Sequence, residues 1–467
     1  MLMNKRNIQH LYLRGGFGIN SNKLKELEDK ATKDVVKELF DDSENYIPLK
    51  IDLSELRIMV IDDNKKNSEK TAKKEAKMRL QKLNRQKTKE LNYAWIDRLK
   101  QPRSILKEKM TLFWANVFVC QDNNNIFHLQ QYNNTLRKFA LGNFKDFVKA
   151  IAKEPSMSKY LNNRQNVKES PNENFARELM ELFTLGVGNY SERDIKAAAR
   201  AFTGWSFKFN GDFYLRENKH DFGQKTFFGK TGNFDGEEII DIILEQKQCA
   251  RFICTKIYYY FVNPKPNEKH IEELANFFYE DYDIKKLMHY IFSSDWFYND
   301  ENIGVKIKSP IELLVGIQTI VPVEFQKKQQ LYNLQKLMGQ ILLNPPNVAG
   351  WKGNKSWIDA NTLMLRLKLS AILLNNAIID IEEKGEFEDS FDDYYKIQKK
   401  QNNYIKTIVS WNVFESEYGI LDLPELKEVL IVAEMDKDTN AFIENLKFSS
   451  NKDFCIQLMS IPEYQLC

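Results

Sequence analysis

The residue types best suited to acid-base chemistry and anion binding gather between Pro171 and Trp205. Glu173, Arg177 and Glu181 follow one another at intervals of four residues, so a helix would stack them on one face, where ion pairs form. Glu178 falls on the same polar arc, opposite the apolar residues of the segment. Because carboxylates move protons and guanidiniums hold anions, this arc is a candidate site. A solvated face or a structural ion-pair network would produce the same pattern.

A second helix follows and carries further carboxylate and guanidinium groups. Ser191 and Asp194 form a variant of the capping box, which predicts that the helix begins there. Arg200 lies near its end, and the segment Gly186-Val187-Gly188 joins the two helices, so their carboxylates and guanidiniums could face one another. Glutamates of the first helix could also supply the two carboxylates of glycoside hydrolysis.

A Gly-rich loop beyond Trp205 holds the next candidate group, His220-Asp221 followed by Lys225. Histidine is the side chain best suited to proton transfer near neutral pH, and a neighbouring carboxylate can orient its ring. Loops frequently carry functional residues, although an exposed loop histidine is often inert. The loop therefore provides a second hypothesis for the acid-base group.

Two tryptophans stand where they could form an aromatic wall for a sugar or a peptide. Trp205 ends the helical stretch, and Trp351 lies in the Pro- and Gly-rich turn from Asn344 to Gly353. A structural corner is the competing explanation for that turn, since Pro and Gly commonly serve turns.

The remaining motifs exclude several kinds of site. The five histidines show no metal-ligand spacing, so we expect no conventional zinc site. The five cysteines include no CxxC pair, and their odd number favours reduced thiols in a reducing compartment. No P-loop, nucleophile elbow or kinase signature is present, so the cofactor is unknown from the motifs.

Charge is nearly balanced over the chain, with 68 Lys and Arg against 65 Asp and Glu and a formal net charge of +3. That total is too small for the whole-chain electrostatics of a dedicated nucleic-acid binder. Positive charge does gather between Lys65 and Glu90. This basic arm has no interleaved aromatic residues, so we expect a solvated helix rather than a nucleic-acid contact.

The first ten residues, Met1 to His10, lack the apolar core of a signal peptide. No apolar run approaches the roughly 20 residues that span a bilayer. We therefore expect a soluble, cytoplasmic protein with no transmembrane segment.

Periodicity predicts a mainly α-helical fold, a multi-helical globular body with one small β-hairpin near residues 205–215. The hairpin signal is Asn210-Gly211 between alternating hydrophobic residues. Helices are expected over Leu24 to Phe40 and over Lys65 to Leu99. The predicted domain organisation is a main helical domain over 1–380 with the hairpin and Gly-rich loop of 205–236 inserted, an acidic linker over 381–398, and a C-terminal helical segment over 399–467 packed on the main body.

Motifs across nearly the whole chain resemble the bacterial domain-of-unknown-function 1800 family. The longest is PNENFARELMELFTLGVGNYSERD, which runs from Pro171 to Asp194. The shorter ones are HLYLRGGFG at His10 to Gly18, EKMTLFW at Glu108 to Trp114, LRKFALGNF at Leu136 to Phe144, AARAFTGW at Ala198 to Trp205, HDFGQKTFFG at His220 to Gly229, KSPIELLVG at Lys308 to Gly316, NPPNVAGWKG at Asn344 to Gly353, and PEYQLC at the C-terminus.

The resemblance implies a bacterial protein of unestablished activity, in a family often encoded beside a sulfatase-like protein. Many relatives are exported, so export stays open for this chain as well. Relatives carry histidines just after the FW motif, where this sequence has Ala115 and Val117. A metal or acid-base role at that position therefore does not carry over.

Together, these residues and the resemblance lead us to expect a hydrolase or transferase acting on an anionic or glycan-like substrate. Whether the protein is an enzyme is left open by the sequence, and the alternative is a non-catalytic binding or assembly partner of a sulfatase-like protein. The expected catalytic residues are Glu178, His220 and Asp221. The expected substrate contacts are Arg14, Asn172, Asn174, Arg177, Glu181, Arg200, Trp205, Lys225 and Trp351.

Overall fold

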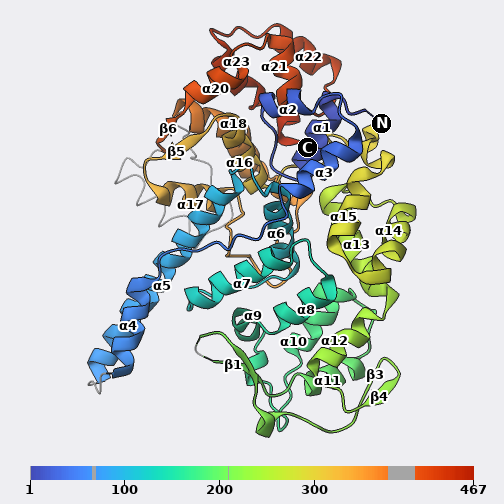
Figure 1. The fold of residues 1–467 in the computed structure, drawn as a ribbon. Helices are drawn as coiled ribbons and strands as arrows, with labels where there is room; N and C mark the ends of the chain where they lie inside the picture. Colours follow the sequence, from blue (N-terminus) through green and yellow to red (C-terminus); the bar gives the residue numbers. More distant parts are fainter. Residues whose placement is uncertain (1, 66–69, 209, 377–404) are drawn as a thin grey trace. The chain divides into compact units, whose positions relative to one another are not determined.

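The computed structural model describes residues 2–65, 70–208, 210–376 and 405–467, and it is mainly α-helical, as periodicity predicts (Figure 1). These residues divide into two compact units that interleave along the chain. Unit 1 comprises Met1–Glu38, Ser293–Ile341 and Lys352–Cys467, and unit 2 comprises Leu39–Phe292 and Leu342–Trp351. The acidic linker predicted over 381–398 lies outside the described residues, so the division of the chain near residue 380 stays a prediction.

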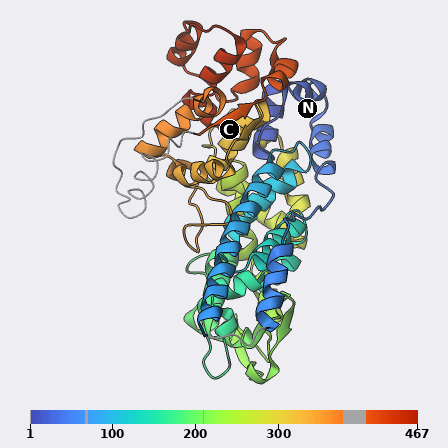
Figure 2. The same ribbon diagram turned by 90° about the vertical axis from the view of Figure 1, so that its left-hand side faces the viewer.

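Unit 2 is built from helices that follow one another along the chain. They are α4 (Ser54–Lys65), α5 (Lys70–Leu99), α6 (Ile105–Val117), α7 (Ile126–Phe139), α8 (Phe144–Ala152), α9 (Pro155–Tyr160), η1 (Asn163–Gln165), α10 (Asn174–Glu178), η2 (Leu179–Thr184), α11 (Glu192–Ala201), η3 (Glu217–Lys219), α12 (Gly236–Leu244), α13 (Lys247–Phe261), α14 (Glu268–Asp281) and α15 (Ile284–Ser293). Helix α5 confirms the long periodic segment, and α4 lies alongside it (Figure 2).

Aromatic residues around α6 form part of the core of unit 2, because this helix is buried on nearly all sides. Trp114 stacks on Phe118 with ring centroids 5.6 Å apart. Phe147 meets both rings edge-on, at 5.3 and 4.9 Å. The indole of Trp114 also donates a hydrogen bond to the carbonyl of Ala140 at 3.1 Å, so its buried polar group is satisfied. This packing fixes the C-terminal end of α6, where the pocket described below begins.

The hairpin predicted at Asn210-Gly211 is present. Strand β1 (Trp205–Phe207) pairs antiparallel with β2 (Phe213–Leu215), with Trp205 opposite Leu215. Two further two-stranded sheets accompany it, β3 (Lys225–Phe227) with β4 (Lys230–Gly232) and β5 (Val323–Phe325) with β6 (Thr407–Val409). Strands β5 and β6 are far apart in the sequence, so no local turn signal predicts their pairing.

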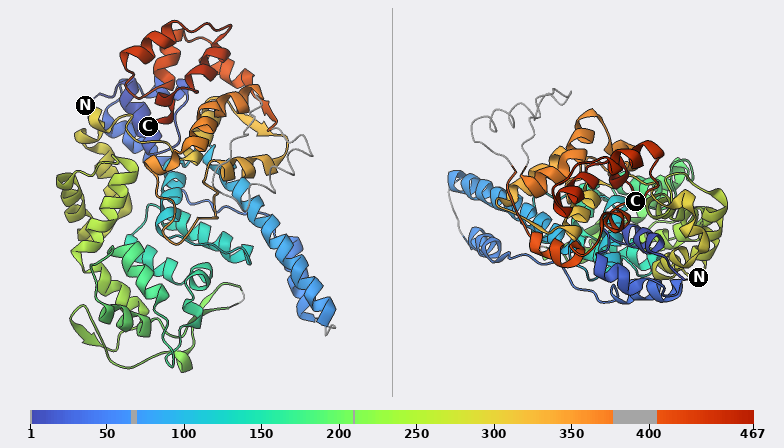
Figure 3. Two further views of the ribbon diagram at one scale, coloured as in Figure 1. Left: turned by 180° about the vertical axis from the view of Figure 1, so that it is seen from behind. Right: turned by 90° about the horizontal axis from the view of Figure 1, so that it is seen from above.

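Unit 1 combines the N-terminal helices with the last part of the chain. Its helices are α1 (Lys5–Arg14), α2 (Ser21–Leu27), η4 (Asp295–Tyr298), η5 (Asp300–Asn302), α16 (Pro310–Ile320), α17 (Lys328–Leu337), η6 (Asn354–Trp357), α18 (Ala360–Asn375), α20 (Trp411–Tyr418), α21 (Leu423–Leu430), α22 (Lys437–Glu444), α23 (Asn451–Leu458) and η7 (Pro462–Gln465). Helix α3 (Thr32–Asp41) begins in unit 1 and ends in unit 2. Helices α20 to α23 gather beside one another (Figure 3).

The single helix predicted over Leu24 to Phe40 is wrong. The chain breaks between α2 and α3, where Asp29 has a left-handed φ of 65°. The backbone there turns to meet the N-terminal segment, and Met3 N donates to Lys30 O at 3.0 Å. A long-range contact therefore interrupts a pattern that is locally helical.

Candidate functional site

The central helical segment of unit 2 changes its winding within the predicted site. Helix α10 ends at Glu178, and the next turn, η2, is a π-helix. The hydroxyl of Thr184 donates to the carbonyl of Leu179 at 2.6 Å, which satisfies one of the displaced carbonyls. Single π-turns inside helices occur frequently at functional sites. Because a π-turn bonds residues i and i+5, it also moves Glu181 off the column that an α-helix would share with Arg177.

Arg177 is held by carboxylates on two helices. It forms two hydrogen bonds of 3.0 Å each with Glu192 at the start of α11, and its Nη2 lies 3.2 Å from Glu173. The hydrogen bonds that Arg177 donates to Glu192 are the main cause that raises the pKa of Arg177. The guanidinium thus links α10 to α11 as a structural ion pair.

Glu178 and Glu181 sit in two different environments. The hydroxyl of Tyr190 donates to Glu181 Oε2 at 2.5 Å. Burial and this hydrogen bond raise the pKa of Tyr190 to about 12, so the hydroxyl stays a donor at neutral pH. Burial, and next the charge of Glu181, raise the pKa of Glu178, while Arg177 opposes the shift. Glu178 therefore retains its proton to a higher pH than an ordinary glutamate.

The expected substrate contacts Asn172 and Asn174 serve the backbone that leads into α10. Asn172 Oδ1 accepts a hydrogen bond from the amide of Asn174 at 3.0 Å. The side-chain amide of Asn174 donates to the carbonyl of Leu161 at 3.1 Å. Both side chains thereby fix the position of the helix that carries Glu178.

Arg200 and the His220 loop form a second cluster at the end of α11. Arg200 Nε and Nη2 lie 2.6 and 3.2 Å from the two carboxylate oxygens of Asp221, and this pairing lowers the pKa of Asp221. Lys225 Nζ donates to the carbonyls of Asp221 at 2.6 Å and Gly223 at 3.0 Å. Burial lowers the pKa of Lys225, and the charge of Asp221 opposes this shift.

His220 is buried within this cluster, at 3% exposure. Its Nδ1 lies 2.7 Å from the carbonyl of Thr203, which can only accept, so Nδ1 carries a proton. The carboxylate of Asp221 is directed to Arg200 and to the amide of Gly223. The loop is thus tied to α11 by its charged residues, and Nε2 is the ring nitrogen left for proton transfer.

The two tryptophans of the predicted aromatic wall lie in different settings within unit 2. Trp205 packs edge-on against Phe202 and Phe213, with centroids 5.0 and 4.9 Å away. A Cβ on Gly236 would come within 2.4 Å of the Trp205 ring, so this indole belongs to the core beneath the hairpin. Trp351 instead lines a pocket.

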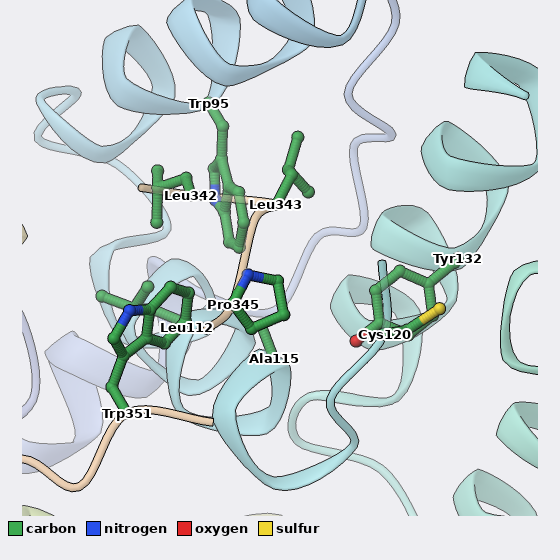
Figure 4. Close-up of a pocket in the computed structure, with 9 residues that line it drawn as sticks. All are labelled: Trp95, Leu112, Ala115, Cys120, Tyr132, Leu342, Leu343, Pro345 and Trp351. Atoms are coloured by element: carbon green, nitrogen blue, oxygen red, sulfur yellow. The ribbon is translucent and has the colours of Figure 1, made fainter. Parts of the chain in front are cut away.

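That pocket lies between α5, α6, α7 and the turn that precedes Trp351, and it encloses about 280 Å³ including its opening to solvent (Figure 4). Pro345 stands at its centre, with Trp351 on one side and Tyr132 and Cys120 on the other. The lining residues are Trp95, Leu112, Ala115, Cys120, Tyr132, Leu342, Leu343, Pro345 and Trp351. Ala115, where the resemblance implies a histidine in relatives, thus contributes only a methyl group.

Asn116 holds the pocket turn in place. Its Oδ1 accepts from the amide of Trp351 at 2.7 Å, and its Nδ2 donates to the carbonyl of the same residue at 3.0 Å. Gly350 is needed beside it, because φ is +72° and a Cβ would lie 2.3 Å from Asn116 Oδ1. The Pro- and Gly-rich turn is therefore a rigid corner that also forms a pocket wall.

Buried titratable groups next to the pocket were not predicted from the sequence. Glu154 Oε1 accepts from the hydroxyl of Thr135 at 2.6 Å, whereas Oε2 is buried without a hydrogen-bond partner. Burial raises the pKa of Glu154 to about 7. Burial also raises the pKa of the Cys120 thiol, and the charges of Asp122 and Glu154 add to the shift. Cys120 is thus a protonated thiol at neutral pH and not a nucleophile.

Lys159 completes this group. Its Nζ lies 2.8 Å from Asp122 and 2.7 Å from His128 Nδ1. Tyr160, the next residue, connects the group to α10, because it lies within electrostatic reach of both Cys120 and Glu178, and burial is the main cause that raises its pKa. No motif spacing relates these positions, so only the packing of α7, α9 and α10 brings them together.

Arg14, the remaining expected substrate contact, belongs to unit 1 and is fully buried. Its Nη2 donates to the carbonyl of Asn302 at 3.0 Å. Across the described ranges, no group of three or more His, Cys, Asp or Glu residues is placed to hold a metal ion. None of the helices in these ranges is long and apolar enough to cross a membrane.

Neither a curated protein nor a solved structure matches the chain. One family model does match, over residues 10–466, and it describes a protein of unknown function, DUF1800. The match extends from His10 in α1 to the end of η7 and so takes in both compact units. This chain is therefore a member of the DUF1800 family.

Proposed function

We propose that the protein is a hydrolase or transferase that acts on a neutral, glycan-like substrate at the Glu178 and Glu181 face. The observation that carries the proposal is the unequal environment of these two carboxyl groups. Burial and a neighbouring negative charge raise the pKa of Glu178, while Tyr190 donates a hydrogen bond to Glu181. Two neighbouring carboxyl groups in different environments are the usual arrangement for an acid and a base acting together.

The charges of the face favour a neutral substrate over an anionic one. Both terminal nitrogens of Arg177 are occupied by Glu192 and Glu173. Arg200 is likewise engaged by Asp221. With its guanidiniums neutralised, the face presents an excess of carboxylates, which repels phosphate and sulfate but suits the hydroxyl groups of a sugar.

The proposed roles of Glu178 and Glu181 follow from their different environments. Glu178 donates its proton to the oxygen of the leaving group as the glycosidic bond breaks. Glu181 accepts a proton from the attacking water or acceptor hydroxyl, and Tyr190 fixes its orientation. Because Glu178 must be protonated, activity falls as pH rises through its raised pKa.

A panel of 4-nitrophenyl glycosides, with release of nitrophenolate as the signal, tests the proposal. We expect Glu178→Gln to lower kcat by about 10²- to 10⁴-fold, which is the usual contribution of a general acid. Glu245→Gln is the matched control, because this exposed glutamate pairs with Lys230 away from the face. Turnover of no glycoside, or unchanged kcat in Glu178→Gln, would contradict the proposal.

The second candidate is a non-catalytic binding or assembly protein. The ion pairs of Arg177 and Arg200 favour it, since they tie α10, α11 and the His220 loop together without leaving these guanidiniums for a ligand. A sulfatase-like partner is suggested only by the family resemblance. Stable co-purification of the two proteins, with no turnover of any glycoside, would favour this function.

A further inference from the structure

The buried charges of unit 1 are strongly unbalanced. Among its buried Lys, Arg, Asp and Glu side chains, within the ranges that the structure describes, four are cations and one is a carboxylate. The cations are Arg14, Lys306, Lys308 and Arg366, and the carboxylate is Glu312. Charges this deeply buried are normally matched by opposite charges, because the low-dielectric interior does not replace the lost water.

Both carboxylate oxygens of Glu312 already have partners other than the two arginines. Its Oε1 lies 2.8 Å from Lys306 Nζ. Its Oε2 accepts from the amide of Ser309 at 2.6 Å, in the capping box that begins α16. Both oxygens of Glu312 are therefore engaged outside the two arginines, and its salt bridge is with Lys306.

Two guanidiniums have buried nitrogens that bond to nothing in the protein. Arg14 uses Nη2 for the carbonyl of Asn302, and Arg366 uses Nη2 for the carbonyl of Lys308 at 2.7 Å. In both residues Nε and Nη1 are buried without a partner. Buried polar atoms of this kind call for a bound water or ion.

Both guanidiniums donate to carbonyls of one short stretch of chain. Their carbonyl acceptors stand at the two ends of the segment Asn302–Lys308, which leads into α16. Burial lowers the pKa of both arginines, to about 10 for Arg366. Cys467 and then Glu312 oppose the shift for Arg14, and Glu312 opposes it for Arg366. Both groups therefore remain charged at neutral pH. Gln465 lies beside them, since its carbonyl accepts from the amide of Lys308 and its side-chain amide is buried without a partner.

We propose that unit 1 binds an oxyanion, a phosphate or sulfate group, on Arg14 and Arg366. Guanidiniums present several N–H donors in a plane that matches phosphate and sulfate oxygens. The N-terminus of α16 adds a favourable dipole to the same stretch. The anion supplies acceptors for the guanidinium nitrogens that have none in the protein. This site is independent of the glycan-like substrate proposed for unit 2.

Thermal unfolding of the full chain, after exhaustive dialysis into chloride buffer, tests the site. We expect phosphate or sulfate to raise Tm saturably by about 3 to 5 °C over sodium chloride of equal ionic strength. Arg366→Gln and Arg14→Gln should lose this rise. Arg251→Gln is the control and should keep it, because that arginine pairs with Glu268 and Glu272 on the surface of unit 2.

Two further measurements complete the test. One identifies the source of the anion, and the other uses only the wild-type protein, so it does not depend on whether the variants fold. Stabilisation by inorganic phosphate or sulfate identifies a free ion, whereas stabilisation by a sugar phosphate alone identifies a group on a larger ligand. The undialysed wild-type protein is also denatured, and the released anions are counted by ion chromatography, with about one equivalent expected. No saturable stabilisation by any of these anions, together with no released anion, overturns the proposal.

Discussion

The two compact units differ in the balance between their buried cations and their buried acids. Unit 2 buries the cations Lys107, Lys109, Arg137 and Lys225 together with the acids Glu108, Asp122 and Glu154, so its interior is nearly neutral. Unit 1 buries four cations with one acid. The difference teaches that the buried ions of unit 2 are mostly satisfied by the protein itself, whereas Arg14 and Arg366 in unit 1 keep guanidinium nitrogens without a protein partner.

The pair of Glu108 and Arg137 shows what a matched buried charge looks like. Arg137 Nε and Nη2 lie 2.6 and 3.1 Å from the two oxygens of Glu108, and both side chains are almost fully buried. The indole of Trp95, a pocket residue, also donates to Glu108 at 3.1 Å. Every oxygen of this carboxylate has a partner, in contrast to the guanidiniums of unit 1.

Breaking the pair of Glu108 and Arg137 gives the largest expected change in the free energy of unfolding. We expect Arg137→Met to lower the free energy of unfolding by about 3 to 5 kcal/mol, because the buried Glu108 loses its bidentate partner and keeps only Arg98, 3.8 Å away. Urea unfolding followed by fluorescence measures the change. The double variant with Glu108→Gln should recover much of the loss. A loss below about 1 kcal/mol in Arg137→Met would show that the matched pair does not stabilise unit 2.

Glu154 is the exception within unit 2, and it makes stability depend on pH. Burial raises its folded-state pKa from 4.5 to about 7, so the folded protein holds a proton that the unfolded chain releases. This stabilisation is present at low pH and is lost as pH rises from 4.5 to about 7, at roughly 1.4 kcal/mol per pH unit or about 3 kcal/mol in all.

Glu154→Gln tests this contribution, since a neutral amide replaces the carboxyl group with the same shape. We expect the variant to be more stable than the wild type at pH 8 and nearly equal to it at pH 5. Urea midpoints at the two pH values provide the measurement. An equal difference between variant and wild type at both pH values would show that Glu154 does not titrate in this range.

The smallest effect is expected in unit 1. In dialysed protein without added oxyanion, Arg366→Met removes a buried charge that no carboxylate matches, so we expect the free energy of unfolding to change by no more than about 1 kcal/mol. The same measurement on Arg137→Met provides the comparison. A loss in Arg366→Met as large as that in Arg137→Met would mean that unit 1 compensates this guanidinium internally, and the contrast between the units would disappear.

Local patterns predicted the parts of the fold that depend on neighbouring residues. The hairpin at Asn210-Gly211 forms because that turn needs residues with positive φ, and Gly211 has φ of +92°. The capping box of Ser191 and Asp194 begins α11 as expected. The interrupted Leu24 to Phe40 segment shows the limit, since a contact with the N-terminal segment overrides local helical preference.

For the candidate site, the sequence by itself determined the family, the helical polar face and the pairing partners that lie within one or two turns. Arg177 contacts Glu173 because four residues make about one turn of an α-helix. Only the tertiary structure decided which carboxyl groups are perturbed. The proton on Glu154, the pairing of Arg200 with Asp221 and the unmatched guanidiniums of Arg14 and Arg366 depend on burial and on partners distant in sequence, which periodicity cannot encode.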